Sequence, residues 1–170
     1  QTGAWVSLSW SEFKHDIERA ASAMALDGIE PEGKIALFTQ NTPEILITHF
    51  AAFYNRAVPV PIYATSSRDE AAYIVADSGA TAIVVGDERQ YKIAVDILKN
   101  NPALKHIITL APAVKRIPGE AFNLSWQEAL DLGKAHGSLW ADVEKTMQDG
   151  VPDDLMYLIY TSGTTGVPKG

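Results

Sequence analysis

Cysteine is absent from the 170 residues, and this excludes three kinds of chemistry at once. Within this stretch no disulfide, no thiolate metal site and no cysteine nucleophile can form. A chain without cysteine is also compatible with the reducing cytoplasm, where we expect this protein to reside.

Positive charge is scarce as well. The sequence has 14 lysines and arginines against 21 aspartates and glutamates, which gives a formal net charge of −7. Proteins that bind nucleic acid present a basic surface to the phosphates, so we expect no nucleic-acid partner. The hydrophobic content of 46% is nevertheless enough for one compact domain with a buried core.

No hydrophobic run is long enough to cross a membrane. The longest apolar region, residues 45–62, is interrupted by His49, Asn55, Arg56 and two prolines, whereas a spanning helix needs about 20 mostly apolar residues. We therefore expect no transmembrane segment. Peripheral contact with a membrane and the formation of an oligomer both stay open.

Helical and extended patterns alternate along the chain. The predicted helices begin near Ser9, Pro43, Ser67, Asp87 and Trp126, and the predicted strands are 34–39, 58–62, 81–86, 106–110 and 155–161. Three of the helix starts carry a serine followed three residues later by glutamate, which is the capping-box pattern. Pro59 and Pro61 restrict their segment to an edge strand or a connector. Strands that alternate with helices of this length indicate an α/β fold with a doubly wound, mostly parallel sheet.

Several residues that could suggest a site favour a structural role instead. The four histidines lack a ligand-like arrangement, so we predict no metal site built from them. Asp153 and Asp154 are expected to form a solvated turn, because successive residues entering a strand point to opposite faces. The four tryptophans are expected in the core or at an interface, with Trp10 on the buried side of the first helix.

The stretch from Leu158 to Gly170, LIYTSGTTGVPKG, has the composition of a phosphate-binding loop. Its glycines let the backbone approach a ligand closely, and its serine and threonine hydroxyls can donate to phosphate oxygens. Lys169 adds a compact positive charge. Successive backbone amides in such a loop form an anion-binding concavity. We favour this interpretation over an ordinary glycine-rich surface turn.

The stretch is not the usual nucleotide P-loop, G-x-x-x-x-G-K-[ST]. Counted from Gly163, Pro168 stands where the second glycine belongs, and Gly170 stands where a serine or threonine would hold Mg²⁺. Proline also has no N–H to donate to a phosphate. A P-loop kinase or GTPase is therefore disfavoured.

Residues 160–170, Y-T-S-G-T-T-G-x-P-K-G, resemble the signature of the acyl-adenylate-forming (AMP-binding) superfamily. Residues 60–67, VPIYATSS, are similar to the corresponding segment of long-chain fatty-acid–CoA ligases, also called acyl-CoA synthetases. Weaker features extend the resemblance over nearly the whole chain. It implies that residues 1–170 are the first part of an N-terminal AMP-binding domain. That incomplete domain ends in the phosphate-binding loop 158–170, and we expect it to be inactive alone.

The resemblance also implies a two-step reaction. A carboxylic acid, here a long-chain fatty acid, attacks the α-phosphorus of ATP to give acyl-AMP and pyrophosphate, and CoA then displaces AMP. Mg²⁺ is the implied metal. Two alternatives stay open: another adenylating enzyme that activates an amino acid or an aryl acid, and a noncatalytic nucleotide- or partner-binding module.

By the same resemblance, the loop holds the β- and γ-phosphates of ATP. The implied nucleotide-binding residues are Thr161, Ser162, Gly163, Thr164, Thr165, Gly166 and Lys169. Lys169 is the implied catalytic residue, because its charge would stabilise the departing pyrophosphate. Thr164 or Thr165 is the implied contact to Mg²⁺, and we select Thr164.

Overall fold

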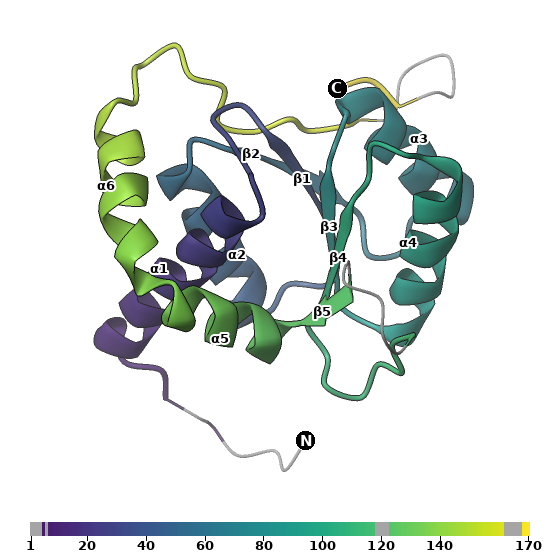
Figure 1. Ribbon diagram of the computed structural model, residues 1–170. Helices are drawn as coiled ribbons and strands as arrows, with labels where there is room; N and C mark the ends of the chain where they lie inside the picture. The colour runs from purple at the N-terminus through teal and green to yellow at the C-terminus, as the bar shows by residue number, and fades with distance from the viewer. Residues whose placement is uncertain (1–4, 6, 118–122, 162–167) are drawn as a thin grey trace.

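A computed structural model of the chain describes residues 5, 7–117, 123–161 and 168–170 (Figure 1). Within these residues lies a five-stranded sheet in the order β2-β1-β3-β4-β5, and every neighbouring pair is parallel. The strands are β1 Lys34–Phe38, β2 Val58–Ile62, β3 Ala82–Val85, β4 His106–Thr109 and β5 Asn123–Ser125. β2 and β5 therefore form the two edges.

Helices cover both faces of this sheet. They are α1 Trp10–Leu26, α2 Pro43–Tyr54, α3 Arg68–Ser78, α4 Glu88–Asn100, α5 Trp126–Ala135 and α6 Trp140–Gln148, with a short 3-10 turn, η1, at Gly137–Leu139. α1, α2, α5 and α6 pack on one face, and α3 and α4 pack on the other (Figure 1). The predicted α/β fold with a doubly wound, mostly parallel sheet is confirmed.

Local sequence signals set where most helices begin. α1, α3, α4 and α5 each start with a closed capping box, in which the N-cap side chain and the third helical residue satisfy each other's backbone N–H groups. α2 instead has Thr42 as its N-cap and Pro43 in the first turn, where the missing N–H costs nothing. The predicted starts of these five helices are confirmed.

The core consists of two layers separated by the sheet. In β1, Ile35 and Leu37 point toward the α1 and α2 side, whereas Ala36 and Phe38 point toward α3 and α4. This alternation is the ordinary geometry of a strand. Because both faces are covered, every residue of β3 is buried, as expected for a central parallel strand.

The sequence patterns predict neither β5 nor α6, and they place one tryptophan wrongly. β5 has only three residues, and asparagine and serine are poor strand formers. α6 begins without a side-chain cap, so the sequence carries no start signal for it. Trp10 is 86% exposed and contacts Phe13 edge-to-face on the helix surface, so its predicted burial is wrong. Among the described residues, no helix is both long and apolar enough to cross a membrane.

Candidate functional site

The two ends of the predicted phosphate-binding loop meet at its base. Thr161 and Lys169 face each other across an antiparallel bridge, in which each backbone N–H donates to the other residue's carbonyl at 3.0 Å. Both residues are exposed. The other predicted nucleotide-binding residues, Ser162, Gly163, Thr164, Thr165 and Gly166, lie outside the described residues. Their roles, including the predicted Mg²⁺ contact of Thr164, therefore stay predictions.

The segment that leads into the loop, residues 155–161, is not a strand, so that prediction is wrong. It runs beside the edge strand β2, and the described backbone bond between them joins the Leu158 N–H to the Pro59 carbonyl at 3.2 Å. The Val58 N–H donates toward β1, so the alternation of the strand turns Pro59 and Pro61 toward the free edge. Prolines offer no N–H there, and a regular ladder cannot form.

An ion pair fixes the start of this segment. Arg56 donates through Nε and Nη2 to the two carboxylate oxygens of Asp154, at 2.8 and 2.9 Å. Asp154 also accepts from the Val151 N–H at 3.0 Å. The hydrogen bond from the guanidinium holds the pKa of Asp154 below its ordinary value. Both side chains are only about a quarter exposed (25% and 28%), so the predicted solvated turn is wrong for Asp154.

An open pocket of about 550 Å³ lies beside the base of the loop. Its lining comes from the carboxyl ends of β1 and β2 and from the segment before the loop, and includes Thr39, Gln40, Asn41, Tyr63, Ile159 and Tyr160. The strand order reverses at β1, since β2 and β3 flank it on opposite sides. Open α/β sheets bind ligands outside the carboxyl ends of their strands at such a reversal. The loop therefore adjoins the part of the sheet best suited to a ligand.

Two side chains of α4 fix the wall of this pocket. Gln90 is fully buried and donates to the Ala64 carbonyl at 3.1 Å, while its own oxygen accepts from the Gly86 N–H at 2.9 Å. Arg89 donates to the same Ala64 carbonyl at 3.1 Å. Any Cβ at Gly86 would overlap the hydroxyl of Thr39, so only glycine fits there. Sequence reasoning missed Gln90, although its position three residues after the N-cap carries the capping-box pattern.

His49 lines the pocket without being available as a cation. Its Nδ1–H donates to the Ile45 carbonyl at 2.7 Å, and its ring lies 5.5 Å from that of Tyr157. Burial lowers the pKa of His49 and thereby favours the neutral ring. The contacts of His49 are those of a structural side chain.

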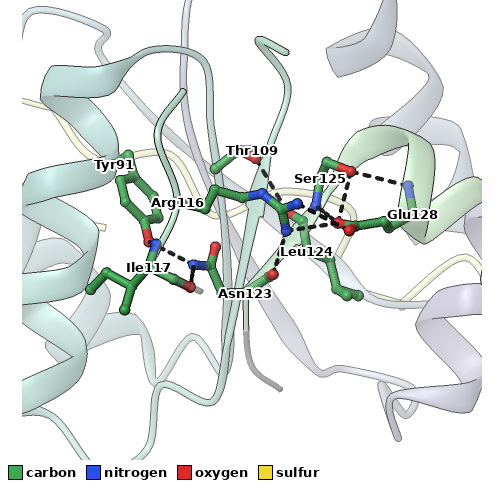
Figure 2. A network of polar contacts seen from close by, with 8 residues as sticks. All are labelled: Tyr91, Thr109, Arg116, Ile117, Asn123, Leu124, Ser125 and Glu128. Atoms are coloured by element: carbon green, nitrogen blue, oxygen red, sulfur yellow. Dashed lines mark hydrogen bonds and ion pairs between the residues drawn. The ribbon is translucent and has the colours of Figure 1, made fainter. Parts of the chain in front are cut away.

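A larger hollow of about 840 Å³ lies near the other edge of the sheet, where Arg116, Asn123, Ser125 and Glu128 bond to one another (Figure 2). The buried Oδ1 of Asn123 has no hydrogen-bond partner among the described residues. Arg116 donates to the Asn123 carbonyl at 2.6 Å and to Glu128 at 3.0 Å. Together with the Ser125 N–H, Arg116 lowers the pKa of Glu128 to about 2. The Asn123 amide in turn donates to the Tyr91 hydroxyl at 2.6 Å. These contacts fasten β5 and the start of α5, so the smaller pocket beside the loop is the better candidate.

The chain is similar over nearly its whole length to proteins of one known family. The model of the family described as AMP-binding enzyme matches residues 2–170. The long-chain-fatty-acid–CoA ligase ACSBG1 of Bos taurus is 29% identical over 168 residues, which are 99% of this chain and 23% of that protein. The long-chain-fatty-acid–CoA ligase FadD15 of Mycobacterium tuberculosis is 28% identical over 170 residues, which are 99% of this chain and 26% of that protein.

A solved structure supports the fold independently. The crystal structure of coronafacic acid ligase from Pectobacterium brasiliense superposes with a TM-score of 0.66 at 19% identity, covering 73% of this chain and 24% of that one. At this identity the likeness concerns the fold alone. The chain spans about a quarter of the length of the curated relatives it matches.

Proposed function

Because the chain belongs to the AMP-binding enzyme family, we propose that residues 1–170 are the first part of the AMP-binding domain of an acid–thiol ligase. The enzyme activates a carboxylic acid with ATP and passes the acyl group to CoA. The observation that carries the proposal is the closed base of the loop, Thr161 paired with Lys169, beside the pocket at the strand reversal.

The loop's part in the first step follows from its chemistry. When the acid's carboxylate attacks the α-phosphorus, negative charge gathers on the pyrophosphate that leaves. In this proposal the backbone amides of residues 162–166 and the hydroxyls of residues 161–165 donate to the phosphate oxygens, and the Lys169 ammonium offsets the growing charge. The backbone bridge between Thr161 and Lys169 supports this proposal, because it brings Lys169 back beside the residue that begins the loop.

A long-chain fatty acid is the proposed substrate, because the relatives that match the whole chain carry that description in their names. ATP and CoA are the proposed co-substrates. The donor set also fits Mg²⁺, which prefers oxygen ligands and takes most of them from phosphates and water. Thr164 is the proposed protein contact to Mg²⁺, through its hydroxyl. Mg²⁺ would neutralise phosphate charge.

We place the protein in the cytoplasm, with peripheral contact to membranes where its fatty acid resides. The net charge of −7 supports small-molecule rather than nucleic-acid partners. An oligomer is compatible with the apolar side chains that stay exposed, such as Leu46 and Phe50 on α2.

ATP–pyrophosphate exchange tests the proposal directly. The complete protein is incubated with ATP, labelled pyrophosphate and one acid at a time from a panel of fatty, aryl and amino acids. Exchange stimulated chiefly by long-chain fatty acids is the expected result. Exchange with an aryl or amino acid would keep the mechanism and replace the substrate. Binding of ATP without exchange for any acid would favour a noncatalytic nucleotide-binding module instead.

A further inference from the structure

Tyr160, the residue before the loop, is tied to α3 by a side-chain contact that spans 83 residues of sequence. Its ring is buried, with 5% of its surface exposed, in the layer formed with α3 and α4. Its hydroxyl donates to the Asp77 carboxylate at 2.6 Å. An O–H···O⁻ bond of this length is charge-assisted and stronger than one between neutral groups.

Tyr160 adjoins one end of the loop in the chain, and its ring lies against the other end. Tyr160 directly precedes Thr161, which pairs with Lys169. On the other side, a Cβ built on Gly170 would lie 2.8 Å from Cζ and 2.9 Å from Cε2 of Tyr160, closer than real Cβ atoms approach. The backbone that leaves the loop therefore passes directly over the ring.

Asp77 is in a position where its own helix does not favour a carboxylate. It belongs to the last turn of α3, where the helix dipole is negative and repels an anion. Among the described residues its contacts are with two phenols, Tyr160 at 2.6 Å and Tyr73 at 3.4 Å, and no lysine or arginine pairs with it. The carboxylate therefore stabilises the position of the tyrosine hydroxyl and does not stabilise its own helix.

We propose that Asp77 and Tyr160 are positioning residues that fix the orientation of the phosphate-binding loop on the sheet. Neither has to touch the substrate. Asp77 accepts from the hydroxyl, the ring lies against the backbone of Gly170, and Thr161 follows Tyr160 directly in the chain, so this contact holds the described ends of the loop against α3. This inference rests on the proposed function, because it assumes that the loop binds the pyrophosphate portion of ATP.

The test uses the complete protein with the variants Tyr160→Phe, Asp77→Asn and the double variant. Tyr160→Phe keeps the ring and removes only the hydroxyl. Tyr91→Phe is the matched control, because Tyr91 is also a buried tyrosine with a bonded hydroxyl but contacts the Asn123 side chain at the opposite edge of the sheet. Calorimetric binding of inorganic pyrophosphate, kcat/KM for ATP, the KM of the acid and the melting temperature are measured for each.

Loss of one charged hydrogen bond should weaken pyrophosphate binding and kcat/KM for ATP about tenfold in Tyr160→Phe. Asp77→Asn should weaken both by a smaller factor, since the amide oxygen still accepts. The KM of the acid should stay within about twofold. The double variant should be no worse than Tyr160→Phe, because both changes break one contact. Tyr91→Phe should lower the melting temperature without changing pyrophosphate binding.

Unchanged pyrophosphate binding in folded Tyr160→Phe would overturn the inference. So would an equal loss of pyrophosphate binding in Tyr91→Phe, because the effect would then reflect general destabilisation. If Tyr160→Phe does not fold, Asp77→Asn decides by the same criteria. Absence of exchange in the unmodified protein with every acid would contradict the proposed function instead, and pyrophosphate calorimetry would still test the contact.

Discussion

The sheet and the stretch that follows α6 are held in place in opposite ways. β1 and β3 are bonded on both sides by neighbouring strands, and their side chains are buried under helices. The stretch 151–161, here called the C-terminal stretch, is fastened to the rest of the molecule at separate points. They include the ion pair of Asp154 with Arg56, the packing of Tyr157 on α2, the backbone bond of Leu158 to Pro59, and the contact of Tyr160 with Asp77.

Exposure differs in the same sense. Leu155, Met156 and Ile159 of the C-terminal stretch are 50%, 58% and 59% exposed, whereas Phe38 and Ile83 of the central strands have no exposed surface. Local opening costs least where few apolar contacts and few backbone bonds must be broken. The sheet therefore supplies most of the stability, whereas the C-terminal stretch is held by separate contacts that can be removed one at a time.

The largest expected effect is the loss of a central side chain. Phe38→Ala removes a fully buried ring between β1 and the α3–α4 side of the core. We expect it to lower the free energy of unfolding by about 3–5 kcal/mol, from lost burial and the cavity left behind. Urea-induced unfolding of the chain, followed by circular dichroism, measures the change.

Met156→Ala is the matched variant in the C-terminal stretch. More than half of this side chain is already in water, so we expect a change below about 0.5 kcal/mol. Equal destabilisation by the two variants would contradict the division into a stabilising sheet and a loosely fastened stretch.

Lys169→Ala should separate stability from function. Lys169 is exposed and its backbone, rather than its side chain, forms the bridge with Thr161. Removing one charged hydrogen bond to the leaving pyrophosphate should slow adenylation about ten- to a hundredfold, with the unfolding curve unchanged. Exchange rates in the complete protein measure this. An unaltered rate in the folded variant would remove Lys169 from the mechanism.

The same contrast explains which features the sequence could predict. Helix starts such as Ser67 with Glu70 depend on residues three positions apart, and the buried strand 81–86 depends on an unbroken apolar run. These signals are local, so they can be recognised in the sequence without knowledge of the fold. The loop motif is also local, because the backbone bridge at its base, Thr161 with Lys169, joins residues within a span of nine.

Contacts between residues far apart in the sequence could not be predicted in this way. Asp154 lies 98 residues from Arg56, and Tyr160 lies 83 residues from Asp77. Nothing near Asp154 in the sequence distinguishes a paired carboxylate from a solvated one. The strand predicted at 155–161 fails for a related reason, because its own residues suit a strand while its neighbour β2 presents prolines at the shared edge.

A smaller effect is expected where the C-terminal stretch begins. Arg56→Gln removes the charge and the bidentate hydrogen bonding to Asp154. Arg56→Lys keeps the charge but can no longer donate to both carboxylate oxygens in this bidentate geometry. Hydrogen exchange measured by mass spectrometry should rise several-fold across 155–161 in Arg56→Gln and less in Arg56→Lys. Exchange in β1 and β3 should not change. A parallel rise in those strands would show that the ion pair supports the whole molecule.

The smallest effect concerns the edge of the sheet near β5, where a local cap and a distant partner act on one carboxylate. The Arg116 guanidinium first, and then Ser125, lower the pKa of Glu128 from 4.5 to about 2. A pKa depressed by folding contributes stability above the unfolded value, and this contribution is lost as pH falls from about 4.5 toward 2. Glu128 is half exposed, so we expect its contribution to the free energy of unfolding to be about 1 kcal/mol or less.

Urea midpoints between pH 7 and pH 2 should fall less steeply for Glu128→Gln than for the unmodified chain. Arg116→Gln should lie between them, because Ser125 still donates to the carboxylate. Identical slopes for all three would mean that the network of Figure 2 leaves the titration of Glu128 unaffected by folding.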